Sequence, residues 1–276
     1  MGKQPLVYLV MRVFAALFKD VLPKVRLVEA AVEQAKSIFW PTQPFFSKIL
    51  ILVWENRKDF PTKSDCGKTF DSCRKRFQHL APYVQVIRVT EGDNFVGAPN
   101  KALEVAFREC CDWLMFMSPE VYEELTPSVC SSFVRAIEKG ARYVGVALPE
   151  LGERGQRGFT GHTFGGWGVN YLWKIGGFDH VAAETPEHAV APVVYYWDGT
   201  KITSVPLRGA EEVVTQARLV RNHGQCLAVI QPDPSVKRKP LAINTKFSSK
   251  QPRQESLLYA RGFSPSLIEW GTLRIE

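Results

Sequence analysis

The first candidate for chemistry is a short polar break, Ser118-Pro119-Glu120, directly after an unbroken apolar run, Trp113–Met117. Such a run suits a strand that is covered on both faces, as in a parallel sheet. Proline has no backbone N–H to offer a neighbouring strand, so the strand must end before Pro119. Because open α/β sheets bind ligands at the carboxyl ends of their strands, Ser118 and Glu120 are predicted to lie at a ligand site. The alternative is that the break only opens the next helix.

Three familiar chemical motifs fail on residue spacing. Gly67-Lys68-Thr69 has the ending of a phosphate-binding loop, but Thr62 stands where that loop needs a glycine. No Gly-x-Gly-x-x-Gly follows the first apolar segment, which disfavours a dinucleotide-binding fold. The histidines lack the spacing of a structural zinc site.

The elements that must position the break alternate between strand and helix patterns, which predicts a right-handed, mostly parallel α/β sheet flanked by helices. The predicted strands are residues 6–13, 49–53, 84–89, 113–117 and 143–148. The predicted helices are residues 25–39 and 71–80, a helix after the turn at 97–100, and residues 127–139, with Thr126 and Pro127 marking the start of the last.

The segment from Gly152 to Gly177 differs in composition, since nine glycines are interleaved with aromatic residues. Two interpretations stay open: a loop that lies over a sugar or nucleotide, or an irregular packed loop. Residues 189–197 and 201–205 then predict two strands joined at Asp198-Gly199. We place a domain boundary after Pro206, with residues 1–206 as the main domain and residues 207–276 as a basic C-terminal extension.

Charge and cysteine content narrow the possible partners and compartments. The 276 residues carry a formal net charge of +7, which favours polyanions such as nucleotide phosphates, acidic lipid surfaces or nucleic acid. Six cysteines without a CxxC pair indicate reduced thiols and a cytoplasmic protein. The apolar run at 6–18 is too short to span a bilayer and is predicted to be a buried first strand.

In this order, the features resemble the family 2 glycosyltransferases, inverting enzymes of the GT-A fold that use nucleotide sugars. The resemblance covers residues 6–206. Phe14 stands where the family has a tyrosine after its first strand, Glu55 keeps one acid of the loop after the second strand, and Asn100 lies in the turn before the third helix. The resemblance implies that these three residues bind the donor nucleotide.

Met115–Val121 matches the strand that carries the metal-binding DxD motif, in a form similar to the Asn-Pro-Asp-Val variant of rhamnosyltransferase-like members. The resemblance implies that Ser118 and Glu120 bind the donor, and that Glu120 binds a divalent cation, Mg²⁺ or Mn²⁺. Ser118 replaces the first carboxylate. The metal is therefore expected to bind weakly or to be dispensable, with an arginine or lysine in its place.

The closest match is Tyr171–Asp179, which resembles the family's acceptor-side segment ending in Gly-Gly-Phe-Asp. Glu187-His188 follows where the family has Glu-Asp, so the resemblance implies that His188, or Glu187 in its place, is the general base. The predicted acceptor side also contains Gly165, Gly166, Trp167 and Asp179. The acceptor would be a glycan, a lipid-linked molecule or another hydroxyl compound, reached in the cytoplasm or at an acidic membrane surface.

The resemblance thus predicts an inverting glycosyltransferase. The sequence leaves two other functions to compare with it. Because several motif positions are substituted, the chain could be a catalytically degenerate GT-A domain that binds a nucleotide or a partner. A nucleic-acid binder that uses the basic residues after Gln231 is disfavoured, because stacking aromatic residues are sparse there.

Overall fold

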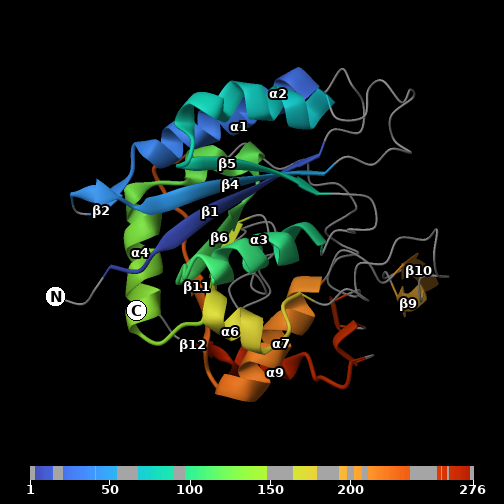
Figure 1. Ribbon diagram of the computed structural model, residues 1–276. Coiled ribbons are helices and arrows are strands. Elements are labelled where there is room, and N and C mark those ends of the chain that lie inside the picture. The colour runs from blue at the N-terminus through green and yellow to red at the C-terminus, as the bar shows by residue number, and fades with distance from the viewer. Residues whose placement is uncertain are drawn as a thin grey trace.

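The structure is a computed structural model of the chain. It describes residues 4–14, 21–40, 42–54, 68–89, 97–147, 164–178, 193–197, 202–206, 211–236, 254–255, 257–259 and 261–273. Their centre is one eight-stranded sheet with the order β12-β11-β7-β8-β6-β1-β4-β5 (Figure 1). Its strands are β1 (Val7–Phe14), β4 (Phe46–Trp54), β5 (Val84–Val89), β6 (Trp113–Met117), β7 (Tyr143–Val146), β8 (Phe164–Gly168), β11 (Leu227–Ile230) and β12 (Thr272–Leu273).

Strand β8 is antiparallel to both of its neighbours, β6 and β7, and the remaining pairs in this sheet are parallel. The predicted mostly parallel α/β sheet is therefore confirmed. Two small hairpins lie outside the sheet: β2 (Phe39–Trp40) with β3 (Gln43–Pro44), and β9 (Val193–Trp197) with β10 (Ile202–Pro206). The second is the strand pair expected around Asp198-Gly199.

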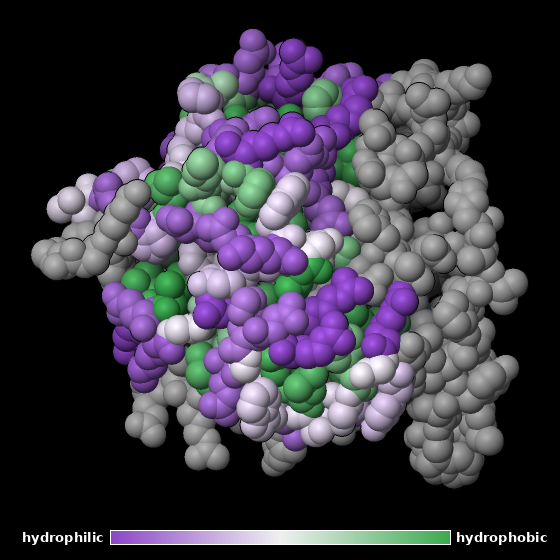
Figure 2. Space-filling model, turned by 60° about the horizontal axis from the view of Figure 1, so that its bottom comes forward, coloured by the Kyte–Doolittle hydropathy of each residue, from purple (hydrophilic) through white to green (hydrophobic). Residues whose placement is uncertain are grey.

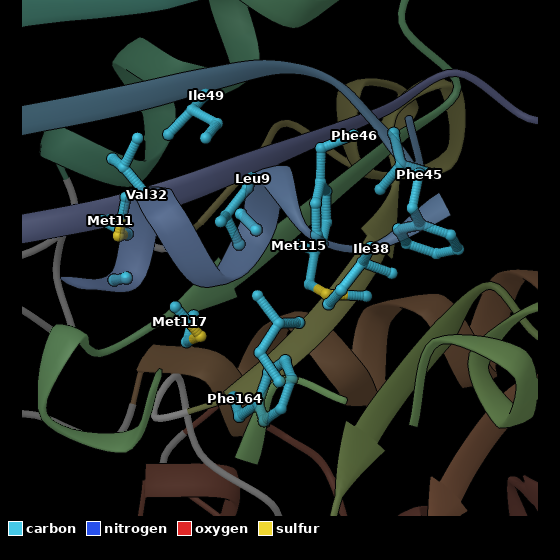
Figure 3. Close-up of a cluster of buried hydrophobic side chains, with 14 of the residues drawn as sticks. Leu9, Met11, Val32, Ile38, Phe45, Phe46, Ile49, Met115, Met117 and Phe164 are labelled. Atoms are coloured by element: carbon cyan, nitrogen blue, oxygen red, sulfur yellow. The ribbon is translucent and has the colours of Figure 1, made fainter. Parts of the chain in front are cut away.

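Helices cover both faces of the sheet, and each face has its own apolar core (Figure 1). One core lies under α1 (Val21–Lys36), α2 (Lys68–Phe77) and α4 (Pro127–Glu138), and Figure 3 shows its centre, where Leu9 and Met11 of β1 meet Val32 of α1. The other lies under α3 (Gly97–Arg108), α6 (Val169–Lys174), α7 (Glu211–His223) and α9 (Ser266–Trp270). Alternate residues of β1 enter opposite cores, as the period of a strand requires.

Helix boundaries differ from the predictions for local reasons. Helix α1 begins at Val21, because Val21, Val25 and Val28 continue its buried face, and it ends at Lys36 before hairpin β2–β3. Gly97–Asn100 forms the first turn of α3 instead of a separate turn. Helix α4 starts as predicted: the Thr126 side chain accepts a hydrogen bond from Val129 N (3.3 Å), and Pro127 takes the first helical position.

Part of the glycine-rich segment 152–177 is a strand and not the loop predicted from the sequence. Its residues 164–168 form β8, a buried strand between β6 and β7, where a loop had been expected. Gly166 is required by packing, because a Cβ there would lie 2.2 Å from Cε2 of Phe133. Trp167 is only 1% exposed and packs on Tyr143, with 4.3 Å between ring centroids. Close packing replaces the apolar side chains that usually identify a central strand.

The chain beyond residue 206 contributes to the same sheet. Strand β11 pairs in parallel with β7, β12 pairs with β11, and Val213 and Val214 of α7 are completely buried. Leu257 and Leu258 are buried as well. Residues 227–230 and 272–273 therefore add two strands to the sheet formed by the preceding strands, and the domain boundary at residue 206 stays a prediction.

The surface visible in Figure 2 is mostly hydrophilic, with hydrophobic side chains in separate small patches among the described residues. Within the described ranges, no helix is long and apolar enough to cross a membrane. The five cysteines described there, 73, 110, 111, 130 and 226, are free thiols, as predicted.

Candidate functional site

The candidate site lies at the carboxyl edge of the sheet, where β1, β4 and β6 end side by side. Met11 of β1 pairs with Met117, the last residue of β6, so β1 continues three residues beyond that pair to Phe14. Phe14 in turn pairs with Trp54, the last residue of β4. Because β1 lies between β6 and β4 in the sheet, the backbone of Phe14 lies between the carboxyl ends of these two strands. The Phe14 side chain and the whole of Glu55 lie outside the described residues.

Ser118 and Glu120 form a hydrogen-bonded pair at this edge. Ser118 is extended, and Pro119–Glu124 forms the short 3-10 helix η3. The Ser118 hydroxyl donates to Oε2 of Glu120, while Oε1 of Glu120 accepts from the ammonium group of Lys24. The break therefore opens a helical turn, as the structural alternative expected, and it also holds a charged cluster at the predicted ligand edge.

The cluster keeps the Glu120 carboxylate charged. Burial by itself raises the pKa of Glu120, but the hydrogen bonds from Lys24 and Ser118 outweigh it, and the pKa lies below its ordinary value. The Lys24 and Glu120 side chains are 32% and 37% exposed, so the pair is accessible to a ligand. An exposed pair of this kind contributes at most about 1 kcal/mol to folding stability.

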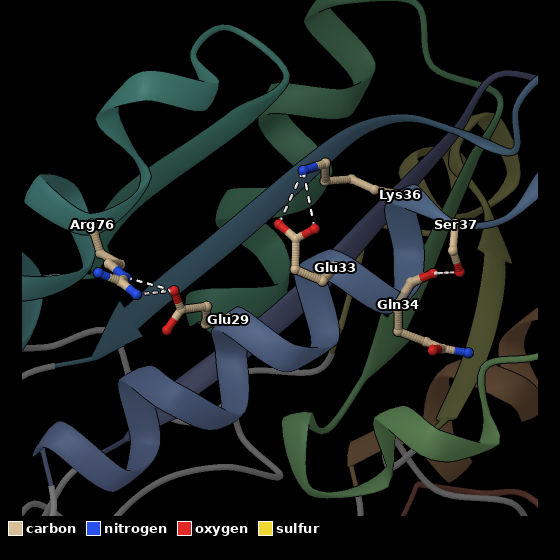
Figure 4. A network of polar contacts seen from close by, with 6 residues as sticks. All are labelled: Glu29, Glu33, Gln34, Lys36, Ser37 and Arg76. Carbon is tan, nitrogen blue, oxygen red and sulfur yellow. Dashed lines mark hydrogen bonds and ion pairs between the residues drawn. The ribbon is translucent and has the colours of Figure 1, made fainter.

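Lys24 comes from helix α1, which neighbouring elements hold against η3 and the sheet. Gln34 Nε2 donates to the carbonyl of Leu125, just after η3, at 2.7 Å. Glu29 accepts from Nε of Arg76 on α2 at 2.6 Å, which joins the two helices (Figure 4). Contacts on two sides of α1 therefore fix the direction from which Lys24 reaches Glu120.

Asn100 makes hydrogen bonds to the Gly176-Gly177-Phe178 segment. Its side-chain nitrogen donates to the carbonyl of Phe178 at 3.2 Å, and its oxygen accepts from Phe178 N at 2.9 Å. Gly177 has φ +74°, and a Cβ there would lie 2.5 Å from Oδ1 of Asn100. The amide thus holds this backbone corner in place, and the nucleotide contact predicted for Asn100 stays a prediction.

Phe178 anchors the same segment to the sheet. Its ring makes edge contacts with Phe116 at 5.7 Å and Trp167 at 5.2 Å between centroids. A pocket of about 260 Å³ beside the corner is lined by Asn100, Leu103, Trp173, Gly176 and Gly177. The predicted acceptor-side residues Gly165, Gly166 and Trp167 lie in the buried strand β8. Asp179, Glu187 and His188 lie outside the described residues.

The described residues fit a divalent cation poorly. Among them, no group of three or more histidine, cysteine, aspartate or glutamate side chains is placed to hold a metal ion. Mg²⁺ and Mn²⁺ prefer several oxygen ligands, and both oxygens of Glu120 already accept hydrogen bonds, one from a cation.

Sequence reasoning did not identify Lys24. Ninety-six positions separate it from Glu120, and a lysine near the start of an amphipathic helix is ordinary in composition. The available signal was topological, because the first helix after the first strand of a parallel sheet begins at the carboxyl edge. A cation in its first turns can therefore approach whatever follows the neighbouring strand.

Comparisons with known proteins support the fold. No protein-family model and no curated protein matches the sequence. The structure is similar to a mannosyltransferase from Pyrobaculum calidifontis solved in complex with GDP-Man and Mn²⁺, with a TM-score of 0.59, 11% identity, and coverage of 97% of this chain and 68% of that chain. At this identity the similarity shows the fold alone.

Two weaker similarities are to nucleotide-using synthases. For 4-diphosphocytidyl-2C-methyl-D-erythritol synthase from Anaerococcus prevotii, the TM-score is 0.46 at 8% identity, covering 92% of this chain and 99% of that chain. For a CMP:2-keto-3-deoxy-manno-octonic acid synthetase complexed with CTP, it is 0.44 at 10% identity, covering 95% and 100%. The sheet order and the mannosyltransferase similarity together establish a GT-A-like α/β fold with a mostly parallel sheet flanked by helices.

Proposed function

We propose that this protein is an inverting glycosyltransferase that moves a sugar from a nucleotide-sugar donor to an acceptor hydroxyl. The observation that carries the proposal is the charged cluster of Ser118, Glu120 and Lys24 at the carboxyl edge of a GT-A-like sheet. This edge is where open α/β sheets bind ligands. In the mannosyltransferase of similar fold, the solved complex contains GDP-Man.

In the proposed reaction, His188 or Glu187 removes the proton of the acceptor hydroxyl as its oxygen attacks the anomeric carbon. The new C–O bond forms on the face opposite the departing diphosphate, which takes the electron pair of the broken bond, so the configuration inverts. Phe14 and Glu55 would bind the base and ribose of the donor. Asn100 would act by positioning Phe178, and thereby Asp179, on the acceptor side.

The test is a panel of nucleotide sugars, each incubated with the protein and simple glycan or lipid-linked acceptors, with nucleoside diphosphate release as the readout. A glycosyltransferase releases diphosphate faster with one donor and an acceptor than with water alone. His188→Ala should then lower turnover much more than donor affinity, and Glu187→Ala less so. If His188→Ala leaves turnover unchanged, Glu187 or another group is the base.

A catalytically degenerate GT-A domain is the second candidate, because Ser118 stands in the place of one of the two DxD carboxylates and Glu120 accepts hydrogen bonds from Lys24 and Ser118. It predicts that a nucleotide sugar raises the melting temperature while no diphosphate is released with any acceptor. If no donor changes the melting temperature and none is consumed, neither function holds.

The proposed contact with an acidic membrane surface is supported by a groove between α1 and α2. The groove has a volume of about 840 Å³. It is lined by Val21, Leu22, Val25, Arg26, Glu29, Ser72, Lys75, Arg76 and His79. Leu22 is 59% exposed, so an apolar tip stands among basic side chains. Co-sedimentation with phosphatidylserine vesicles, but not with phosphatidylcholine vesicles, would support this contact, and equal recovery in both pellets would oppose it.

A further inference from the structure

Lys24 contacts Glu120, the residue that the family resemblance assigns to a metal. We infer that Lys24, instead of a divalent cation, supplies the positive charge that binds the donor diphosphate at the carboxyl edge. The inference rests on the proposed nucleotide-sugar function and deepens it: it names the group that neutralises the leaving group, and it makes donor binding independent of divalent cations.

The contacts of Glu120 are the first support. A cation bound to Glu120 would have to displace the ammonium from Oε1 or share the carboxylate with it, at close range to a like charge. The other oxygen already accepts from the Ser118 hydroxyl. Ser118 adds no charge of its own, so this site has one carboxylate where the resemblance expected two. A lysine ammonium is the better partner for a single carboxylate.

The position of Lys24 is the second support. Lys24 is the fourth residue of α1, and this helix begins at the edge where β1 and β6 end. A lysine ammonium has three donor hydrogens, so a contact with Glu120 leaves it able to donate to a phosphate oxygen as well. Because Gln34 and Glu29 tie α1 to its neighbours, the lysine is presented from a fixed backbone. Preorganised charge of this kind costs little reorganisation when a ligand binds.

In the transfer step, Lys24 would act only through charge and hydrogen bonds. The bond between the anomeric carbon and the diphosphate oxygen breaks, and its electrons pass to the diphosphate, whose negative charge grows. Lys24 keeps its protons and donates more strongly to that oxygen as the charge develops. The acceptor proton goes to the general base, so the step balances without a metal.

Glu120 and the diphosphate are then competitors for one cation. In the free protein, Glu120 neutralises Lys24. In the complex, its negative charge lies near the phosphates and opposes them. The inference therefore predicts opposite signs for the two partners: loss of Lys24 weakens diphosphate binding, and loss of the Glu120 charge strengthens it. A metal held by Glu120 predicts weaker binding for loss of the Glu120 charge.

The experiment is calorimetric titration of the full chain with UDP, GDP, CDP, dTDP and ADP, each in EDTA and each in Mn²⁺. The expected result is that at least one of them binds with an affinity that differs less than about threefold between the two conditions. Tenfold or tighter binding in Mn²⁺ would overturn the inference while leaving the proposed function standing. If no nucleoside diphosphate binds under either condition, the proposed function fails and the inference falls with it.

Four variants complete the test with the tightest-binding nucleotide in EDTA. Lys24→Met should weaken binding about tenfold or more, because a direct charge contact to phosphate is lost, and Lys24→Arg should retain most of the affinity. Glu120→Gln should bind at least as tightly as the unmodified protein. Lys36→Met is the control on the same helix, since Lys36 pairs with Glu33 and not with the edge cluster. Unchanged affinity in Lys24→Met, or weakened affinity in Glu120→Gln, would overturn the inference.

Discussion

Two lysine–glutamate pairs lie at opposite edges of the same sheet. At the carboxyl edge, Lys24 pairs with Glu120, and at the amino edge Lys48 pairs with Glu109. The two glutamates are equally exposed, at 37% each. Burial of the glutamate therefore does not distinguish the pairs, and their difference depends on what surrounds them.

The amino-edge pair joins elements of the fold. Oε2 of Glu109, just after α3, accepts from the Tyr8 hydroxyl at 2.7 Å as well as from Lys48, and thereby connects α3 to β1 and β4. Burial first, and then the hydrogen bond to Glu109, raises the pKa of Tyr8, so the phenol remains a neutral donor. The carboxyl-edge pair lies instead beside the ends of β1 and β6. Similar chemistry is thus structural at one edge and, in our proposal, functional at the other.

The largest expected loss of stability concerns β8, the strand between β7 and β6. Trp167→Ala should lower the free energy of unfolding by about 3–5 kcal/mol, because it empties a fully buried indole site next to Tyr143 and Phe178. Urea denaturation followed by tryptophan fluorescence or circular dichroism measures this loss. A loss near zero would instead favour an acceptor-facing loop at residues 164–168.

A smaller effect is expected at the corner near the carboxyl edge. Asn100→Ala removes both hydrogen bonds to the Phe178 backbone and should cost about 1–3 kcal/mol of stability, since that backbone is left with unmade bonds. Asn100→Asp keeps the hydrogen-bond acceptor and loses the donor, so its stability should lie between that of the unmodified protein and that of Asn100→Ala. The measurements are denaturation and nucleoside diphosphate titration. Unchanged stability with weakened nucleotide binding would make Asn100 a donor-binding residue, as the sequence had suggested.

The smallest effect is expected at the amino-edge pair. Burial raises the pKa of Glu109, but the hydrogen bonds from Lys48 and Tyr8 have the larger combined effect, so the pKa lies below its ordinary value. The stabilisation by this charge is therefore complete above the unfolded carboxyl pKa of about 4.3 and is lost as the pH falls through the folded value. Glu109→Gln should cost at most about 1 kcal/mol at pH 7 and less at lower pH. A cost that grows on acidification would contradict the pairing.

Local patterns in the sequence predicted the sheet more completely than the site. The bounds of β5 and β6 are those expected, because continuous or alternating apolar runs in Val84–Val89 and Trp113–Met117 reflect burial directly. Strand β8 escaped prediction because Gly165, Gly166 and Gly168 carry no hydrophobic signal. Each is explained only by a ring that the fold brings against it, Tyr143 at Gly165, Phe133 at Gly166 and Tyr171 at Gly168.

The sequence predicted where the candidate site lies but not all of the contacts that its side chains make. Glu120 was expected at the edge because an apolar strand ends three residues before it, at Met117. Its contact with Lys24 depends on how α1 packs beside η3, which local spacing does not encode. In the same way, the hydrogen bonds of the Asn100 amide to the Phe178 backbone depend on the packing of the Gly-Gly-Phe corner, whereas its predicted nucleotide contact stays a prediction.

The most direct test compares Lys24→Met with Lys48→Met, the same substitution at the two edges. Nucleoside diphosphate affinity would be titrated in EDTA, alongside the melting temperature of each variant. We predict that Lys24→Met loses about tenfold or more in affinity with little change in melting temperature. Lys48→Met should keep its affinity and melt at a lower temperature. Equal affinities in the two variants, or a loss confined to Lys48→Met, would contradict a ligand site at the carboxyl edge.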